Sequence, residues 1–280
     1  MRSLIVSGFC VCLVLYAGCS DTINQQVVTQ IVDVPRVSSI SKHAQGFSFP
    51  QGLAFDSSGN LLVVNTLTGV ISRVHLAGAV DTITTAAQVS AWIAVGPTGH
   101  IYVSSYGDGT VKRVPSTGGT MTNFVTGQDN PAGIAFDKAG NLYIANFNSN
   151  QVRIKTPSAD TVFATFAYGP TGLVFDNLGN LFVSHQLAHT ISKVSPSGTI
   201  STFATGILSP HNIAFDNRGN LFVSQSTPAS RTITVITATH HIYQFSADFY
   251  WPTGIAFDSQ GSLYVSNYDS TFVSKVTIQY

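Results

Sequence analysis

The chain alternates short apolar runs with small turn residues, and this pattern recurs along most of its length. Each recurrence has an apolar run, a turn built on Asp and Gly, and a second apolar run that ends in a polar residue. Six such segments begin at residues 50, 90, 131, 170, 210 and 252, so successive starts differ by 40, 41, 39, 40 and 42. A period near 40 with this composition is typical of β-propeller blades. The sequence therefore predicts six radially arranged repeats.

Each repeat predicts a β-hairpin around its Asp and Gly. In the third repeat an apolar run ends at Asp137, and a second run begins after Gly140 and Asn141. An Asp side chain accepts hydrogen bonds from backbone amides in a type I turn, and Gly supplies the left-handed residue that lets the chain return. Five of the six repeats keep the Asp, and the second has Gly96 in its place.

Two further segments in each repeat complete a four-stranded sheet. In the fourth repeat an alternating stretch with a basic residue spans residues 190–194, and another apolar segment spans residues 199–204. The first two strands of each repeat are apolar on both faces, as expected of strands packed between neighbouring sheets. The sequence therefore predicts an all-β protein with antiparallel four-stranded blades.

The two ends of the chain are expected to share one blade. The last repeat ends at Tyr280, directly after its third strand, which is predicted at residues 271–278. Residues 40–44 stand as far before the first repeat as residues 200–204 stand before the fifth. We expect this N-terminal strand to complete the sixth blade, because ring closure removes exposed sheet edges. The predicted fold is a six-bladed β-propeller over residues 37–280.

Residues 1–19 have a different composition and are predicted to be an export signal. Arg2 precedes an apolar stretch at residues 4–17, and Gly18 and Cys19 follow it. This stretch is shorter than the ~20 residues that a membrane-spanning helix needs, which favours a secretory signal over an anchor helix.

Residues 15–19 (LYAGC) resemble the lipobox of bacterial lipoproteins, although Tyr16 stands where that motif prefers leucine. The resemblance implies lipidation of Cys19 as the mature N-terminus, and it places the protein in the cell envelope, on the periplasmic or the cell-surface side. Residues 20–36 would then be a polar tether between the membrane and the ring. The alternative is ordinary signal cleavage without a lipid.

Charge and cysteine content exclude several functions. Thirteen basic residues balance thirteen acidic ones, charged residues make up 9% of the chain, and no basic patch is evident, which argues against nucleic-acid binding. All three cysteines (Cys10, Cys12 and Cys19) precede the repeats, so the ring has neither a disulfide nor a thiolate metal site. We expect a monomer without a cofactor, whose ligand is recognised by hydrogen bonds and stacking.

One face of the predicted ring carries the candidate ligand-binding residues. In a four-stranded meander the start of the first strand, the loop after the second and the end of the fourth lie on the same face. Aromatic rings beside amides would suit stacking on a carbohydrate or a peptide. The alternative for the two tryptophans is that they plug the channel or pack the seam where the ring closes. The candidates on this face are Gln51, Trp92, Tyr106, Asn146, His185, His211, Asn212, Trp251, Asn267 and Tyr268.

Three histidines of the same face allow an alternative chemistry. His185, His189 and His211 are expected near one another on two neighbouring blades, where they could bind a transition metal or supply a general base. We favour the simpler interpretation that they satisfy loop backbone groups, because spacing across separate blades is a weak metal signature. Four loop aspartates of this face are expected to be solvated: Asp108, Asp129, Asp248 and Asp269.

The repeats resemble those of NHL-type six-bladed propellers and of the gluconolactonase/regucalcin superfamily, over roughly residues 37–280. Gluconolactonase-like relatives hold a divalent cation in the channel with Glu, Asn and Asp side chains, whereas this chain contains no glutamate. Residues 210–213 (PHNI) are also similar to repeats of virginiamycin B lyases, whose chemistry uses His and Glu with a metal. The glutamate is again missing.

These observations predict a binding or sensing module of the cell envelope that lacks catalytic activity. The alternative is a divergent hydrolase or lyase of the gluconolactonase-like or virginiamycin B lyase-like type, which would use the histidines of the channel rim.

Overall fold

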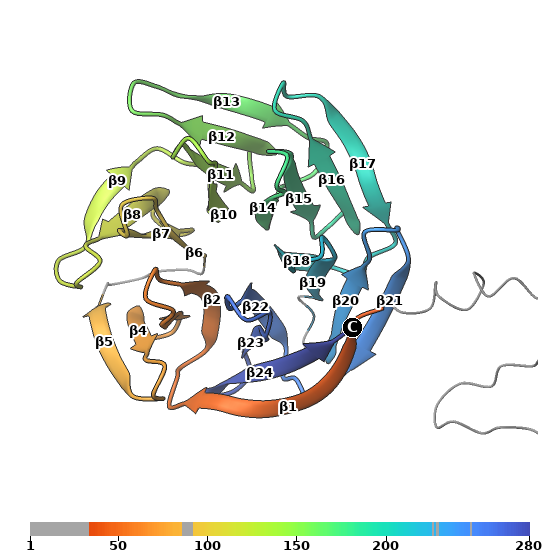
Figure 1. Ribbon diagram of the computed structural model, residues 1–280. Helices are drawn as coiled ribbons and strands as arrows, with labels where there is room; N and C mark the ends of the chain where they lie inside the picture. The colour runs from red at the N-terminus through yellow and green to blue at the C-terminus, as the bar shows by residue number, and fades with distance from the viewer. Residues whose placement is uncertain (1–33, 86–91, 226, 228–229, 247) are drawn as a thin grey trace, which may run out of the picture. The chain divides into compact units, whose positions relative to one another are not determined.

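The computed structural model describes residues 34–85, 92–225, 227, 230–246 and 248–280. Within these residues the secondary structure consists of 24 strands and no helix. The strands form six four-stranded antiparallel sheets around a central axis, with the first strand of each sheet innermost (Figure 1). This ring spans Pro35–Gln279. The predicted six-bladed β-propeller is therefore confirmed.

Each blade follows one repeat of the sequence. Blade 1 comprises β2 (Pro50–Phe55), β3 (Leu61–Asn65), β4 (Val70–Val74) and β5 (Val80–Thr85). Blade 2 comprises β6 (Ile93–Val95), β7 (Ile101–Ser105), β8 (Thr110–Val114) and β9 (Thr122–Val125). Blade 3 comprises β10 (Pro131–Phe136), β11 (Leu142–Asn146), β12 (Gln151–Lys155) and β13 (Asp160–Thr165).

The second half of the ring repeats this arrangement. Blade 4 comprises β14 (Leu173–Phe175), β15 (Leu181–His185), β16 (Thr190–Val194) and β17 (Ile200–Thr205). Blade 5 comprises β18 (Pro210–Phe215), β19 (Leu221–Gln225), β20 (Thr232–Ile236) and β21 (Ile242–Ser246). Blade 6 comprises β22 (Pro252–Phe257), β23 (Leu263–Asn267), β24 (Phe272–Gln279) and β1 (Arg36–Gln45).

The sixth blade closes the ring with its N-terminal strand, as predicted. β1 pairs antiparallel with β24, and Ile40 lies opposite Val276. The register shifts twice along this pair, between Val37 and Ser39 and again between Lys42 and Ala44. Such bulges bend the strand and increase its twist. β1 thereby covers the edge of the C-terminal strand that would otherwise be exposed.

In the five blades that have it, the Asp of the first hairpin organises its turn through backbone amides. Asp56 Oδ1 accepts hydrogen bonds from the amides of Ser58 and Asn60, each at 2.9 Å. The Asn60 side chain donates to the second carboxylate oxygen at 3.0 Å, and Gly59 adopts a φ of 80°. The same pattern holds at Asp137, Asp176 and Asp216. The predicted turn chemistry is confirmed.

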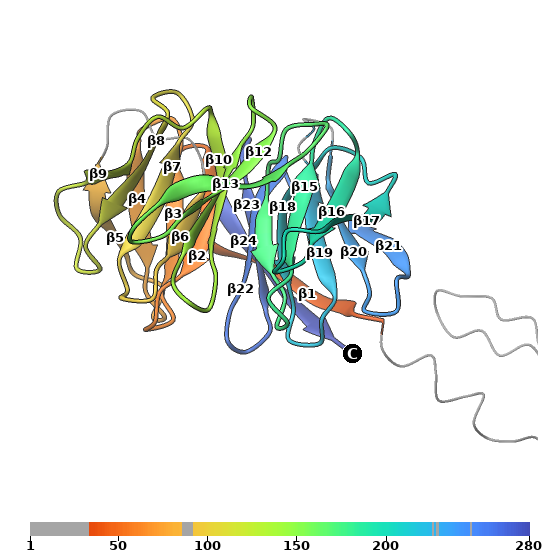
Figure 2. The same ribbon diagram turned by 90° about the horizontal axis from the view of Figure 1, so that it is seen from above.

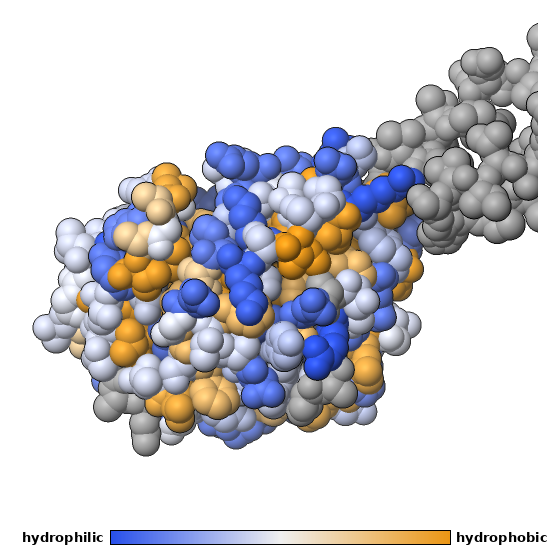
Figure 3. Space-filling model, turned by 90° about the horizontal axis from the view of Figure 1, so that it is seen from below, coloured by the Kyte–Doolittle hydropathy of each residue, from blue (hydrophilic) through white to orange (hydrophobic). Residues whose placement is uncertain are grey.

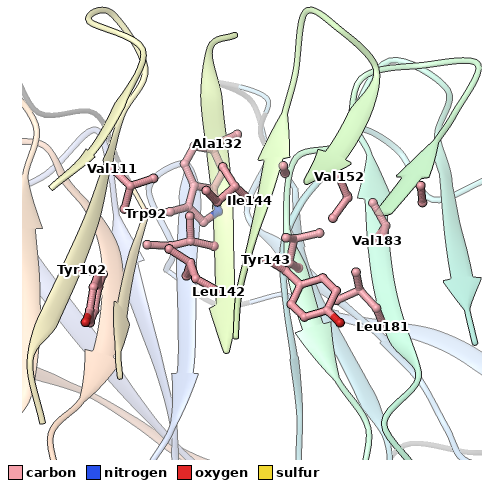
Figure 4. Close-up of a cluster of buried hydrophobic side chains, with 14 of the residues drawn as sticks. Trp92, Tyr102, Val111, Ala132, Leu142, Tyr143, Ile144, Val152, Leu181 and Val183 are labelled. Carbon is pink, nitrogen blue, oxygen red and sulfur yellow. The ribbon is translucent and has the colours of Figure 1, made fainter. Parts of the chain in front are cut away.

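The second strands form the centre of the hydrophobic core. Every residue of the second strand is buried in all six blades. Alternate side chains of such a strand fill the two seams on its two sides: Leu142 and Ile144 lie toward blade 2, whereas Tyr143 lies toward Leu181 of blade 4 (Figure 4). A strand buried on both faces is mostly apolar, which explains the apolar runs that open these strands in the sequence.

The innermost strands of neighbouring blades approach so closely that a side chain does not fit between them. A Cβ at Gly254 would overlap the carbonyl oxygen of Gln51 in blade 1, and one at Gly172 would overlap that of His211 in blade 5. Likewise, the amide of Gly133 donates a hydrogen bond to the carbonyl oxygen of Thr171 in blade 4, with an N–O distance of 2.7 Å. The Pro-x-Gly start of these strands is therefore a requirement of blade-to-blade contact.

Buried serines tie three of these seams together. Ser266 Oγ accepts from the amide of Gly254 in its own blade and donates to the Gln51 carbonyl of the next blade, both at 2.7 Å. Ser184 bridges blades 4 and 5 in the same way, and Ser224 bridges blades 5 and 6. Each hydroxyl satisfies two buried backbone groups, so these hydrogen bonds stabilise the inner wall of the channel.

The ring has two faces that carry different connections between strands. One, the hairpin face, carries the turns between first and second strands and between third and fourth strands. The other, the loop face, carries the loops after the second strands and the connections between blades. β1 begins at Arg36 on the hairpin face and runs toward the loop face (Figure 2). The outer wall between the faces is a mosaic of hydrophilic and hydrophobic side chains (Figure 3).

The predicted signal peptide at residues 1–19, Cys19 and all but the last three residues of the predicted tether lie outside the described residues. The described residues contain no helix with the length and apolarity that crossing a membrane requires.

Substituting a glycine of the inner wall should destabilise the ring. We expect Gly254→Ala to lower the free energy of unfolding by about 3 kcal/mol, because the new methyl group overlaps a backbone oxygen that cannot move independently. Gly107→Ala is the matched control, since a Cβ there meets no atom within 4 Å, and we expect a change within about 0.5 kcal/mol. Urea denaturation of both variants measures this difference. Equal stabilities would contradict the proposed role of the contact.

Candidate functional site

A cavity of about 300 Å³ opens where residues of all six blades meet on the loop face. We call it the central pocket. Each blade contributes from the start of its first strand, from the residue that follows its second strand, or from both. The lining residues are Gln51, Thr66, Trp92, Tyr106, Ala132, Phe147, Thr171, Gln186, His211 and Tyr268.

Five of the ten residues predicted from the sequence line this pocket: Gln51, Trp92, Tyr106, His211 and Tyr268. Gln51 Oε1 accepts a hydrogen bond from Thr66 Oγ1 at 3.2 Å, so these two side chains hold each other at the wall. The Trp251 ring, which is half-buried, packs edge-on against Tyr268 with 5.0 Å between ring centroids. Trp251 thus supports a wall of the pocket from behind.

Three other predicted residues end the second strands and bind loops instead. Asn267 accepts from the amide of Tyr250 at 3.0 Å and donates to Ser274 Oγ at 3.0 Å. His185 contacts the Tyr168 carbonyl and Ser192 Oγ, and Asn146 donates to Gln128 Oε1. All three are buried.

The last predicted residue, Asn212, occupies the glycine position of its first strand. Its side chain is half-buried, and its backbone amide donates to Ser224 Oγ at 3.0 Å. Asn212 is not among the residues that line the central pocket.

Sequence reasoning missed three pocket residues that follow second strands: Thr66, Phe147 and Gln186. They occupy the same position of the repeat as Tyr106 and Tyr268, which were predicted as rings of the loop face that could stack on a ligand. The signal that identifies them is this shared position. An apolar residue after an apolar strand, such as Phe147, resembles a core residue.

Two rings from opposite blades meet at the pocket. Trp92 begins blade 2 and His211 begins blade 5, which lies across the axis of a six-bladed ring (Figure 1). Their centroids are 4.7 Å apart with an interplanar angle of 38°. Trp92 is 9% exposed, and its buried Nε1 has no hydrogen-bond partner among the described residues. The pair fills the channel at this level.

Burial makes the His211 imidazole a weak base. It lowers the pKa of His211 to about 4, and the approach of Nδ1 to the Thr253 carbonyl at 3.4 Å opposes this shift. The ring is therefore neutral at neutral pH. Because Nδ1 faces a carbonyl oxygen, we assign the proton to Nδ1, which leaves Nε2 as an acceptor.

The other two histidines of the predicted cluster have separate partners. Burial lowers the pKa of His185, and both of its ring nitrogens lie within 3.0 Å of a partner. His189 is exposed, and its Nδ1 accepts from the amide of Ser209 at 2.9 Å. Both rings thus hydrogen-bond with backbone groups of the connections between blades, and His185 also contacts Ser192 Oγ of β16.

The pocket lining is uncharged. It includes no Asp, Lys or Arg, and the internal residues outside the described ranges are Ala, Gln, Val, Ser and Pro. Among the described residues no three His, Cys, Asp or Glu side chains gather closely enough to hold a metal ion. A hard divalent cation needs six or more oxygen ligands that include carboxylates, so this lining does not fit the cation of gluconolactonase-like propellers.

Comparisons with known proteins identify the fold. No protein-family model matches the chain, and the search of curated proteins finds no match. Among solved structures, virginiamycin B lyase from Staphylococcus aureus matches with a TM-score of 0.66 and 16% identity, covering 87% of this chain and 99% of that one. A gluconolactonase from Xanthomonas campestris matches with a TM-score of 0.75 and 14% identity, covering 88% and 95%. The chain shares their fold.

A third match extends the range of functions found on this fold. The PQQ-bound aldose sugar dehydrogenase from Streptomyces coelicolor has a TM-score of 0.70 and 17% identity, covering 88% of this chain and 98% of that one. The resemblance to gluconolactonase-like and virginiamycin B lyase propellers is thus confirmed at the level of the fold. At these identities it does not transfer an activity, because one fold supports many functions.

Acid should destabilise the ring through His211. Its pKa is about 4 in the folded chain against 6.5 for the free side chain, so the unfolded state binds the proton first, and stability is lost as the pH falls from 6.5 toward 4. Between about pH 7.5 and about pH 5 we expect His211→Gln to lose about 2 kcal/mol less stability than the unaltered chain, measured by urea denaturation.

Part of the acid sensitivity should remain in that variant, because burial also lowers the pKa of His43 and His185. The control is His189→Gln, which changes an exposed imidazole of the loop face. If both variants lose as much stability in acid as the unaltered chain, His211 does not titrate as its burial requires.

Proposed function

We propose that this protein is an exported, lipid-anchored binding module of the cell envelope, and that its central pocket holds a neutral ring-shaped group of a ligand without converting it. The observation that supports this proposal is the lining of the pocket. Four aromatic side chains come from three blades, amides and hydroxyls stand between them, and charged side chains are absent from this lining.

The pocket favours a neutral group of limited size. Its volume of about 300 Å³ is at the lower end of the range for ligand sites, so one sugar ring or one amino-acid side chain fits better than an extended chain. Aromatic faces such as Tyr106, Phe147 and Tyr268 suit the apolar face of a sugar or a flat side chain. Gln51 and Gln186 supply amides for hydrogen bonds.

The residues present argue for binding rather than catalysis. General acid–base catalysis works best when the catalytic pKa is near the working pH, whereas burial lowers the pKa of His211 to about 4. A hydrolase of the gluconolactonase type needs carboxylates beside its cation, and the pocket lining supplies none. The aromatic walls and amides remain as the functional groups of the site.

The competing function is a divergent hydrolase or lyase that uses His211, the one imidazole of the pocket lining. Elemental analysis of protein purified without a metal-binding tag separates the two. Stoichiometric metal that disappears in His211→Ala would favour the enzyme.

Export and anchoring rest on the first nineteen residues of the sequence. The apolar stretch and Cys19 support a lipoprotein signal, and the ring begins on the hairpin face at Arg36. An anchored chain would then enter the ring on the side opposite to the central pocket. This arrangement supports a ligand that arrives from outside the membrane.

Small neutral probes should bind the pocket and charged ones should not. We expect saturation-transfer NMR to detect methyl glycosides or N-acetyl aromatic amino-acid amides, with little signal for glucuronate or glucosamine, because an uncharged buried wall does not compensate a desolvated charge. Tyr106→Ala should weaken binding about tenfold. The control Leu178→Ala removes an exposed side chain of the hairpin face and should have no effect. Equal effects of the two variants would contradict the assignment of the pocket.

Replacing Cys19 should release the protein from membranes. A lipidated cysteine partitions with the membrane through its acyl chains, so Cys19→Ala should move the protein to the soluble fraction and abolish incorporation of labelled palmitate. Cys12→Ala, which changes a cysteine inside the apolar stretch, is the control and should stay membrane-bound. If the unaltered protein is found in the soluble fraction and incorporates no labelled palmitate, the proposed lipid anchor is contradicted.

A further inference from the structure

We propose that the ligand of the central pocket is part of a protein, and that a crown of exposed leucines around the pocket docks that protein partner. This inference rests on the proposed function, because it takes the central pocket as the binding site. The leucine crown consists of Leu67, Leu187 and Leu208, which are 71%, 64% and 53% exposed.

The crown residues stand next to or near pocket residues in the sequence. Leu67 and Leu187 directly follow the lining residues Thr66 and Gln186, and they belong to blades 1 and 4, which lie on opposite sides of the axis. Leu208 stands three positions before the lining residue His211, in the connection between blades 4 and 5. A group seated in the pocket therefore brings its flanking atoms over leucine side chains.

The connections of the loop face expose further large apolar side chains, because three aromatic residues join the leucines. On the hairpin face, among the described residues, the turns expose Leu76 and Leu178, and the outer strands begin with exposed Val80, Ile200 and Ile242. The loop face differs in that its apolar side chains accompany a pocket. Apolar clusters around a pocket mark interaction sites on soluble proteins. The aromatic members on the loop face are Phe49, Tyr168 and Tyr250.

The chemistry of the crown favours a protein over a carbohydrate. Leucine side chains cannot hydrogen-bond with sugar hydroxyls. A sugar that docks on them would give up hydrogen bonds to water without forming new ones. Apolar and aromatic side chains of a protein are complementary to them, and a deep anchor surrounded by a water-excluding rim is the usual arrangement of a binding hot spot. The central pocket has the size for one such anchor side chain.

Charges on the same face favour a basic partner over a membrane surface. Asp129, Asp248 and Asp269 are exposed on the loop face and form no ion pair with another described residue. Lys42 lines the groove that contains Asp248 and Asp269, and its ammonium lies 4.6 Å from the centre of the Phe272 ring. Exposed carboxylates are repelled by anionic lipids. Arg231 is also exposed on this face, with its guanidinium 4.8 Å from the centre of the Tyr250 ring, but the three carboxylates outnumber it and attract Lys and Arg of a partner.

A random peptide library displayed on phage, selected on the purified full-length chain, tests this inference. We expect the enriched peptides to share an aromatic or aliphatic anchor next to Lys or Arg. Fluorescence anisotropy of the synthetic peptides then measures their affinity for variants. The combined Leu67→Ser, Leu187→Ser and Leu208→Ser variant should bind them about tenfold more weakly. The control combines Leu76→Ser with Leu178→Ser on the hairpin face and should bind as the unaltered chain does.

The outcomes separate this inference from the proposed function. Peptides that lose affinity in Tyr106→Ala but keep it in the crown variant would overturn the crown and leave the pocket as the site. If neutral oligosaccharides bind and no peptide is enriched, the crown is likewise overturned and the pocket remains the site. Binding to phosphatidylglycerol vesicles that depends on the leucines would overturn the protein partner. Peptides that bind both variants as tightly as the unaltered chain would overturn crown and pocket together.

Discussion

The direct contact between the innermost strands of neighbouring blades is the constraint on which the rest of the structure depends. Gly172 and Gly254 have no room for a Cβ, because a carbonyl oxygen of the next blade occupies that space. Serine hydroxyls bridge the same strands, so backbone groups that face the channel wall are satisfied without water. Six strands packed this tightly leave a narrow channel, and a ligand site has room only at its end.

The central pocket arises where the repeat departs from this rule. Two opposite blades carry a larger residue at the glycine position: Trp92 in blade 2 and Asn212 in blade 5. At Trp92 the indole ring reaches His211 across the axis and fills the channel. Identical repeats would line the channel with the same residue in every blade. A residue that departs from the repeat therefore changes the size and polarity of the channel wall at one place. The substitutions in the pattern carry more information about the site than the pattern itself.

The fold was predictable from the sequence because its determinants are local and repeated. Asp56 with Gly59 defines a hairpin by its own hydrogen bonds, and the closing strand was placed by spacing alone, with Ile40 opposite Val276 as expected. The site was predictable only in part. His185 ends β15 and hydrogen-bonds with its surroundings, whereas the next residue, Gln186, follows the strand and lines the pocket. The position of a residue in the repeat predicts on which face of the ring it lies. It does not predict which of two adjacent residues at the end of a strand lines the pocket.

The topology of the closing blade places the start of β1 and the central pocket on opposite faces of the ring. β1 enters on the hairpin face, pairs along β24, and delivers the chain to the loop face, where the amide of Phe47 donates to the Thr271 carbonyl at 3.0 Å. A force applied to the N-terminal end of β1 acts along this pairing and meets its hydrogen bonds before it reaches the first blade. The central pocket and the leucine crown lie on the loop face, which is the face at which β1 ends. Anchoring through the N-terminus would therefore load the seam of the ring while it leaves the binding face accessible.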